Sequence, residues 1–274
     1  MLYKTLSIAG FDGSGGAGIQ ADLKTFSALG CYGMTVLTAL PVQNTCGVRS
    51  CHALPAALIE EQLIAIFDDI TPDAIKIGML FNQEIIETVA KFLKQYAPDI
   101  PIVLDPVTVA KSGDALLLPE AVFTLKNKLI PLATLVTPNL PEAYTLTDIP
   151  CTTEQDMPLV AHELLKLGTY AVLLKGGHLT GSEADDFYQD QLGNEEWLQG
   201  TRIDSKNTHG TGCTLSAAIT SLLAHKYTLI EACTMAKVYL TQAISGAKHQ
   251  VIGKGNGPVH HFYDLWPIDH TKLK

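Results

Sequence analysis

The residues best suited to chemistry gather between positions 207 and 218, which read Asn-Thr-His-Gly-Thr-Gly-Cys-Thr-Leu-Ser-Ala-Ala. Gly210 and Gly212 allow a tight turn that runs directly into a helix of small residues. Backbone N–H groups at the start of that helix, together with the positive end of its dipole, would form a cradle for an anion such as phosphate. Cys213 lies at the same helix terminus, where we expect a lowered thiol pKa. An anion cradle beside an activatable side chain predicts phosphoryl transfer.

Composition limits the classes of protein that fit. The chain has 274 residues, 47% of them hydrophobic, and we expect one α/β domain over residues 1–274. Its formal net charge of −9 argues against a nucleic-acid partner. The six cysteines form no zinc-ligand pattern, so we expect reduced thiols in a cytoplasmic protein. No signal-peptide pattern or membrane-length apolar run is present, and we expect no membrane partner.

Short apolar runs alternate with longer amphipathic segments, which predicts a mostly parallel sheet covered by helices on both faces. The expected strands are residues 5–9, 34–39, 74–77, 102–104, 132–136 and 171–175. The expected helices are residues 17–28, 56–67, 83–95, 156–167, 211–224 and 230–244. Residues 185–201, in which Tyr188 and Trp197 flank Leu-Gly-Asn, predict a late β-hairpin.

Polar residues follow the ends of several expected strands. Asp105 comes directly after one strand, Asn139 and Glu142 follow the next, and Lys175 and His178 follow another. Ligands of open α/β sheets bind outside the carboxyl ends of the strands, so these side chains should share one edge of the sheet. Singly, Asp105 could also be a helix cap and His178 a structural turn residue.

A glycine-rich loop at residues 13–18 matches the dinucleotide pattern G-x-G-x-x-G, which makes an oxidoreductase the main rival interpretation. That interpretation also needs an acidic residue about 20 positions further on. Residues 36–45 contain no Asp or Glu, Asp22 comes too early, and Gln43 and Asn44 stand there instead. The Walker pattern is absent as well. A Gln carboxamide can donate to and accept from the edge of a heteroaromatic ring, so Gln43 indicates a small flat ligand.

Taken together, the motifs resemble the hydroxymethylpyrimidine/phosphomethylpyrimidine kinases of thiamine biosynthesis, within the ribokinase-like superfamily. The resemblance covers about residues 4–250, and its motifs occur in the order typical of that family. They lie at residues 13–22, 42–45, 76–79, 104–107, 110–113, 137–142, 175–178 and 206–214. Two departures are the opening Gly-Phe-Asp-Gly at residues 10–13 and Thr108, where a Met is expected.

The resemblance implies a three-layer α/β/α sandwich that uses ATP and Mg²⁺, in a homodimer. It implies phosphorylation of 4-amino-5-hydroxymethyl-2-methylpyrimidine and then of its monophosphate. The implied pyrimidine-site residues are Asp22, Gln43, Met79 and Val107, with Gly10 and Ala17 over them. The implied nucleotide-site residues are Asn139, Lys175, His178, Thr208 and Lys237, with Asp105 and Glu142 for the metal. The implied catalytic residues are Gly210, Thr211, Gly212 and Cys213, the last in place of an Asp base.

Several alternatives stay open at this point. Met79 and Val107 would be core residues in most proteins, and Lys237 could reach either a nucleotide phosphate or water. His209 could shape its turn rather than react. Pyridoxal kinase shares the fold and is the second enzyme to consider, because Cys213 and Lys175 could engage an aldehyde. A catalytically inactive relative is disfavoured, because the base and both metal acids are present.

Overall fold

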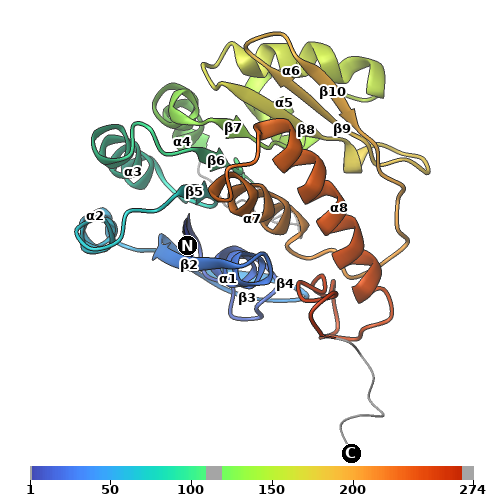
Figure 1. Ribbon diagram of the computed structural model, residues 1–274, viewed down its shortest axis with the longest axis horizontal. Helices are drawn as coiled ribbons and strands as arrows, with labels where there is room; N and C mark the ends of the chain where they lie inside the picture. Colours follow the sequence, from blue (N-terminus) through green and yellow to red (C-terminus); the bar gives the residue numbers. More distant parts are fainter. Residues whose placement is uncertain (1, 109–118, 267–274) are drawn as a thin grey trace, which may run out of the picture.

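The computed structural model describes residues 2–108 and 119–266, so that the motif at residues 110–113 lies outside the described residues. An eight-stranded sheet runs through the centre of the molecule in the order β10-β9-β8-β7-β6-β5-β1-β2 (Figure 1). Its strands are β1 (Tyr3–Ala9), β2 (Cys31–Leu37), β5 (Ala74–Ile77), β6 (Ile102–Leu104), β7 (Leu135–Val136), β8 (Ala171–Lys175), β9 (Asp186–Asp190) and β10 (Glu195–Leu198). The six strands from β8 to β2 pair in parallel, and β9 and β10 add an antiparallel hairpin at one edge. The predicted mostly parallel sheet and the late hairpin are both confirmed.

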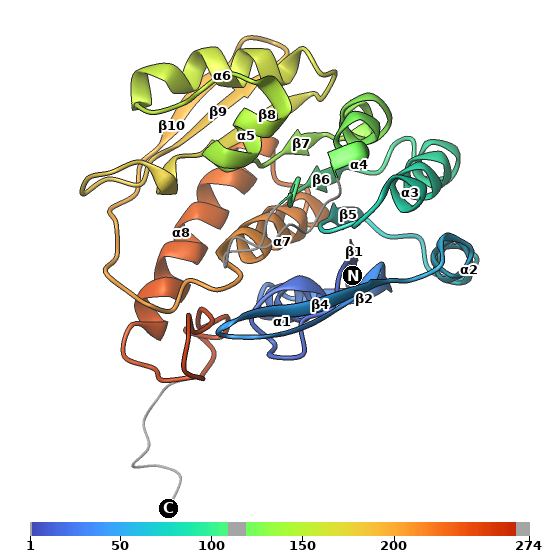
Figure 2. The ribbon, with the colours of Figure 1, turned by 180° about the vertical axis from the view of Figure 1, so that it is seen from behind.

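Helices cover the two faces of the sheet, and Figure 2 shows the second face from behind. One face carries α1 (Gly18–Ala28), α7 (Thr211–Ala224) and α8 (Leu229–Ala247). The other carries α2 (Ala56–Phe67), α3 (Gln83–Tyr96), α4 (Pro119–Thr124), α5 (Leu140–Thr147) and α6 (Met157–Leu165). The sheet is therefore the middle of three layers.

Alternate residues of the central strands feed two separate cores. In β6, Ile102 and Leu104 pack into the cluster under α2 and α3, whereas Val103 packs into the cluster under α7 and α8. Because both faces are covered, every residue of this strand is buried. That burial explains why the central strands are continuous apolar runs in the sequence.

A small two-stranded sheet stands apart from the central one. It consists of β3 (Ala39–Asn44) and β4 (Gly47–Ala53), paired antiparallel. The strand predicted over residues 34–39 is confirmed for residues 34–37, which belong to β2, whereas the β3–β4 hairpin that follows was not predicted. The hairpin escaped notice because it is half exposed, with Leu40 and Val42 of β3 open to solvent. Gln43 therefore lies on this hairpin and not at the end of a central strand.

Short helical turns account for the other differences. The strand expected over residues 132–136 begins only at Leu135, because Leu132 ends a 3₁₀ turn, Ile130–Leu132, that follows a π-helical turn, Leu125–Leu129. Two short helices, α4 and α5, were not predicted, because six or eight residues carry little periodic signal. Within residues 2–108 and 119–266, none of the helices is both long and apolar enough to cross a bilayer.

Candidate active site

A cavity of about 970 Å³ opens at the carboxyl ends of the parallel strands. Its walls come from the loops after β1, β5, β6, β7 and β8, from the β3–β4 hairpin, and from α7 and α8. Every site residue implied by the sequence lines this cavity except Asp22. Strand topology thus brings together side chains that lie up to about two hundred positions apart.

The turn before α7 forms the floor of the cavity. Gly210 precedes the helix with a φ of +77°, which favours glycine, and a Cβ there would collide with the carbonyl oxygen of Gly16. A Cβ on Gly212 would lie 3.3 Å from both Asp105 Oδ2 and Lys175 Nζ. The positive end of the helix dipole therefore opens toward a charged pair, as the sequence predicted for an anion cradle.

Cys213 belongs to this first helical turn, but its thiol is not activated there. Burial raises the pKa of the Cys213 thiol to about 11, and the neighbouring Lys76 ammonium offsets only part of that increase. The expectation of a lowered pKa was therefore wrong. Burial is the largest influence on this pKa, because removing water disfavours the thiolate, and the carboxylates of Asp22 and Asp105 add repulsion.

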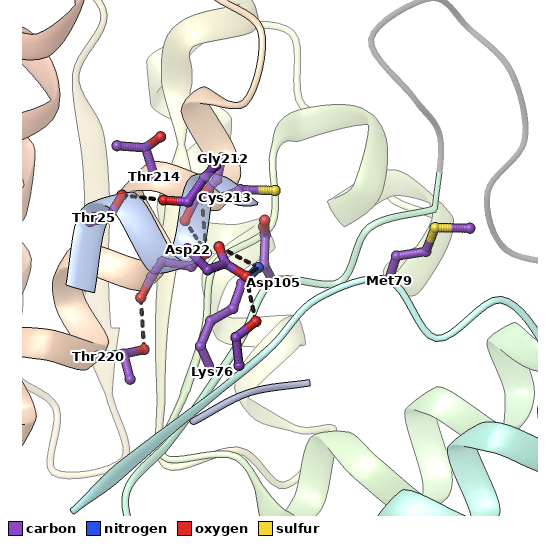
Figure 3. Close-up of polar contacts among 12 residues, drawn as sticks. Asp22, Thr25, Lys76, Met79, Asp105, Gly212, Cys213, Thr214 and Thr220 are labelled. Carbon is purple, nitrogen blue, oxygen red and sulfur yellow. Dashed lines mark hydrogen bonds and ion pairs between the residues drawn. The ribbon is translucent and has the colours of Figure 1, made fainter. Parts of the chain in front are cut away.

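Beneath Cys213 lies a fully buried ion pair (Figure 3). Lys76 Nζ donates to both carboxylate oxygens of Asp22, at 3.0 and 2.8 Å, and Ser7 Oγ donates to Asp22 at 2.5 Å. Burial alone would lower the pKa of Lys76, but the Asp22 carboxylate raises it, so that the ammonium stays charged.

Asp22 does not line the cavity, and its expected place against the substrate was wrong. Helix α1 directs the carboxylate toward β1 and β5, where Ser7 and Lys76 bind it. Lys76 is the cavity residue in its place. The signal was present in the sequence, because a lysine between isoleucines in a buried strand must have a buried partner.

A second charged cluster forms the wall of the cavity beside the α7 turn. Lys175 Nζ lies 2.9 Å from Asp105 Oδ1 and 3.9 Å from Glu142 Oε2. Burial alone would lower the pKa of Lys175, but the two carboxylates raise it. Burial raises the pKa of Glu142 to about 7, although Lys175 favours its charged form. The wall thus combines one fixed cation with an acid that titrates near neutrality.

Asn139 and Glu142 also have a structural task. The Asn139 side chain accepts from the backbone N–H of Glu142 at 2.9 Å, and Glu142 Oε2 accepts from the N–H of Asn139 at 2.8 Å. This capping box starts α5 and holds the Glu142 carboxylate beside Lys175. One short helix therefore explains why these two residue types are spaced by three.

The carboxylates on this wall fit a divalent cation that is shared with phosphates. Mg²⁺ is usually held by one or two carboxylates together with substrate phosphates and water. Asp105 and Glu142 supply two hard oxygen donors. No group of three or more His, Cys, Asp or Glu residues arranged for a metal occurs in the part of the chain that the structure describes. Two carboxylates suit a metal ion that is also bound by nucleotide phosphates better than a metal ion bound by protein ligands alone.

At the other end of the cavity the lining is mostly apolar. Met79 is held through its carbonyl oxygen, which accepts from Thr38 Oγ1 at 2.6 Å. A Cβ on Gly10 would lie 3.1 Å from Met79 Sδ, so that glycine leaves the thioether in place. Gln43 projects its amide into this region, with Nε2 3.4 Å from the carbonyl of Phe11. Val107 closes the wall after a tight turn from Asp105.

Sequence reasoning missed Asp12, which organises the glycine-rich loop. Its carboxylate accepts from the N–H groups of Ser14, Gly16 and Ala17 at 2.9, 3.1 and 2.8 Å. His209 Nε2 lies 2.8 Å from the same carboxylate. Burial alone would raise the pKa of Asp12, but its hydrogen bonds to His209 and Ser14 lower it to about 2. This contact agrees with a role for His209 in shaping the turn.

Lys237 lines the cavity and does not point freely into water. Its ammonium donates to Asp186 Oδ2 at 2.8 Å and to the carbonyl of Ala184 at 2.5 Å. The lysine therefore joins α8 to the loop before β9 at the rim of the cavity. His178, at the end of the 3₁₀ turn Gly176–His178, and Thr208, in the segment before Gly210, also line the cavity.

The three layers, the anion turn and the two lysine–carboxylate clusters define a ribokinase-like kinase. The phosphomethylpyrimidine kinase family matches residues 12–260 of this chain, and the chain belongs to that family. A hydroxymethylpyrimidine/phosphomethylpyrimidine kinase of Salmonella typhimurium is 48% identical over 262 residues, which cover 95% of this chain and 98% of that protein.

Solved structures agree with this family. A phosphomethylpyrimidine kinase from Clostridium difficile superposes with a TM-score of 0.78 at 48% identity, covering 88% of this chain and 99% of the other. A pyridoxal kinase from Staphylococcus aureus, in complex with AMP-PCP and pyridoxal, superposes with a TM-score of 0.87 at 35% identity. That match covers 96% of this chain and 95% of the other.

Proposed function

We propose that this kinase transfers the terminal phosphoryl group of ATP to the hydroxymethyl oxygen of 4-amino-5-hydroxymethyl-2-methylpyrimidine. A second transfer to the monophosphate then gives the pyrophosphate used in thiamine biosynthesis. The observation that carries the proposal is the shape of the cavity. Gln43 and Met79 form an apolar end suited to a flat ring, and the α7 turn beside Lys175 forms an anion-binding end.

The chemistry divides among these residues. The alcohol oxygen attacks the terminal phosphorus, the bond from phosphorus to the ADP oxygen breaks, and the alcohol proton must pass to a base. Phosphoryl transfer depends chiefly on positioning and on neutralising charge. The α7 turn and Lys175 would supply that charge neutralisation. Mg²⁺ held by Asp105 and Glu142 would supply further neutralisation of the phosphates.

Cys213 is the proposed acceptor of the alcohol proton. A thiol with a pKa of about 11 is largely protonated at neutral pH, so Cys213 would act only as the transition state forms. Lys76 beneath it would stabilise the developing thiolate. The proposed base thus depends on a buried cation that lies in a sequence motif but was given no role there.

A product assay tests the proposal. The protein is incubated with ATP and Mg²⁺ and, in separate reactions, with the pyrimidine alcohol, its monophosphate and pyridoxal. We expect the monophosphate and the pyrophosphate of the pyrimidine by mass analysis. Turnover of pyridoxal without turnover of either pyrimidine would overturn the assignment.

Pyridoxal kinase is the second candidate, favoured by the pyridoxal-bound structure that superposes over nearly the whole chain. Cys213 and Lys175 both line the cavity and could engage an aldehyde. Activity on pyridoxal beside activity on both pyrimidines would make it a side reaction of the same site.

We further propose that the protein is a cytoplasmic homodimer. The six cysteines support a reducing compartment, because all are free thiols. The exposed apolar residues Leu40 and Val42 of the hairpin support a partner surface. Sedimentation at micromolar concentration tests the dimer.

A further inference from the structure

The segment after α8 runs between two walls of the cavity. Residues 248–258 leave the C-terminal end of α8 and pass beside the tip of the β3–β4 hairpin, as the two ribbon views agree (Figures 1 and 2). Residues 253–258 read Gly-Lys-Gly-Asn-Gly-Pro, and we call them the strap. The strap touches the hairpin at one point and the turn before α7 at another.

The first attachment point is Thr45, at the tip of the hairpin. The N–H of Asn256 donates to the Thr45 carbonyl at 3.0 Å, and the N–H of Gly255 donates to Thr45 Oγ1 at 3.2 Å. Gly253 has a φ of +76°, and a Cβ there would collide with the Thr45 side chain. A Cβ on Gly255 would collide with the Thr45 carbonyl oxygen. The glycines therefore permit a close approach to the hairpin, which no larger residue allows.

The second attachment point is His209, directly before the anion turn. The N–H of His209 donates to the Gly257 carbonyl at 3.0 Å, and His209 pairs with Pro258 as a short parallel bridge. The buried Asn207 donates from Nδ2 to the carbonyls of Ala247 and Gln250, at 2.5 and 2.8 Å. The His209 bond anchors the strap to the residues that lead into Gly210, and the Asn207 bonds tie those same residues to the end of α8.

The chain of contacts continues into the glycine-rich loop. His209 Nε2 meets Asp12 Oδ2, and the same oxygen accepts from the N–H groups of Gly16 and Ala17. A Cβ on Gly16 would also lie 3.2 Å from Pro258 Cβ. Three walls of the substrate end, which come from β1, β3 and α7, thus meet through the strap.

We propose that residues 253–258 are a positioning strap that sets the distance between the Gln43 hairpin and the anion turn. Few contacts hold the hairpin to the central sheet, and β3 pairs only with β4 among the described strands. The strap supplies two of the bonds that fix its tip. Without these two bonds, Gln43 could move away from the α7 turn, while Lys175 and Asp105 at the nucleotide end of the cavity would stay in place.

Gly253→Ala tests the strap, and Gly30→Ala is its matched control. Both glycines have left-handed backbones, with φ of +76° and +74°, but a Cβ on Gly30 would meet open space. The two variants therefore carry the same backbone strain, and only Gly253→Ala pushes against Thr45. We expect amide hydrogen exchange in residues 39–53 to become about tenfold faster in Gly253→Ala than in Gly30→Ala.

A second pair of variants keeps the test independent of folding defects. Thr45→Val removes the hydroxyl that accepts from Gly255, whereas Thr45→Ser retains it. We expect faster hairpin exchange in Thr45→Val and wild-type exchange in Thr45→Ser. The proposed role of the strap would be overturned by equal hairpin exchange rates in Gly253→Ala and Gly30→Ala. Equal rates in Thr45→Val and Thr45→Ser would overturn it as well.

Kinetics connect the strap to the substrate site, and this step rests on the proposed function. In Gly253→Ala we expect the KM for the pyrimidine alcohol to rise by about threefold to tenfold, with the KM for ATP unchanged. Equal rises in both KM values would overturn a role confined to the substrate end. If the wild-type protein did not phosphorylate the pyrimidine, the proposed function would be refuted. The hydrogen-exchange experiment would still test whether the strap positions the hairpin.

Discussion

The buried pair under Cys213 permits a prediction in which two substitutions act in opposite directions. Lys76 and Asp22 both act electrostatically on the Cys213 thiol, the first lowering its pKa and the second raising it. Lys76→Met removes the favourable cation, and Asp22→Asn removes the unfavourable anion. If both residues mattered only for folding, the two variants would behave alike.

The size of each effect follows from the geometry. The Lys76 ammonium and the Asp22 carboxylate are 2.8 Å apart, where unit charges at an effective dielectric constant of about 20 attract by about 6 kcal/mol. Removing either partner leaves a buried charge unpaired, which destabilises a protein by about 3–5 kcal/mol. For the thiol, a nearby charge shifts the pKa by about one unit or more.

The assay is the rate at which iodoacetamide alkylates Cys213 between pH 7 and pH 9, followed by peptide mass spectrometry. With a pKa of about 11, about one thiol in a thousand is ionised at pH 8. We expect about tenfold faster alkylation in Asp22→Asn and about tenfold slower alkylation in Lys76→Met. Exposed Cys46 in the same sample is the internal standard for the reagent.

The double variant Asp22→Asn/Lys76→Met removes both charges and serves as the control for folding. We expect it to be more stable than either single variant, with an alkylation rate near that of the wild type. Rates that change in the same direction in both single variants would refute the electrostatic argument. So would a double variant that reacts like Lys76→Met alone.

Three further predictions concern the proposed roles. Gln43→Ala should weaken binding of the pyrimidine by about 1–3 kcal/mol, because a buried polar partner loses its hydrogen bond. Calorimetry should show unchanged ATP affinity, and equal loss of both affinities would mean that Gln43 supports the fold. Glu142→Gln should lower turnover and raise the Mg²⁺ concentration needed for half-maximal rate. Because the pKa of Glu142 is raised to about 7, the wild-type Mg²⁺ requirement should rise as the pH falls below 7, and that pH dependence should vanish in Glu142→Gln. Cys213→Ser should reduce turnover by about 10²–10⁴-fold with both substrates still bound, and a parental rate in Cys213→Ala would make the thiol a packing residue.

The mostly parallel sheet and the edge that carries the site could be predicted from the sequence. Buried parallel strands are continuous apolar runs, and the residue after each run must lie at the carboxyl edge of the sheet. That rule placed Asp105, Asn139 and Lys175 correctly around one cavity. The glycines at positions 210 and 212 likewise indicated a helix start, which α7 confirms.

The partners of the buried charges could not be predicted, because contacts between distant segments leave no local pattern. Asp22 and Lys76 are 54 positions apart, and only the packing of α1 against β1, which pairs with β5, brings them together. Sequence reasoning therefore assigned Asp22 to the substrate and overlooked Lys76. The half-exposed β3–β4 hairpin was missed as well, because its alternation is weak and its place depends on contacts near the C-terminus.

The thiol pKa shows most clearly what only the tertiary structure decided. From the sequence, Cys213 stands at a helix terminus, and that local term lowers its pKa. Folding then surrounds the thiol with protein and with the carboxylates of Asp22 and Asp105, and burial becomes the largest influence. The sequence by itself determined most of the residues that reach the site, since apolar runs and glycine turns are local properties. Their ionisation was decided by the fold, because desolvation and charge depend on every segment packed around them.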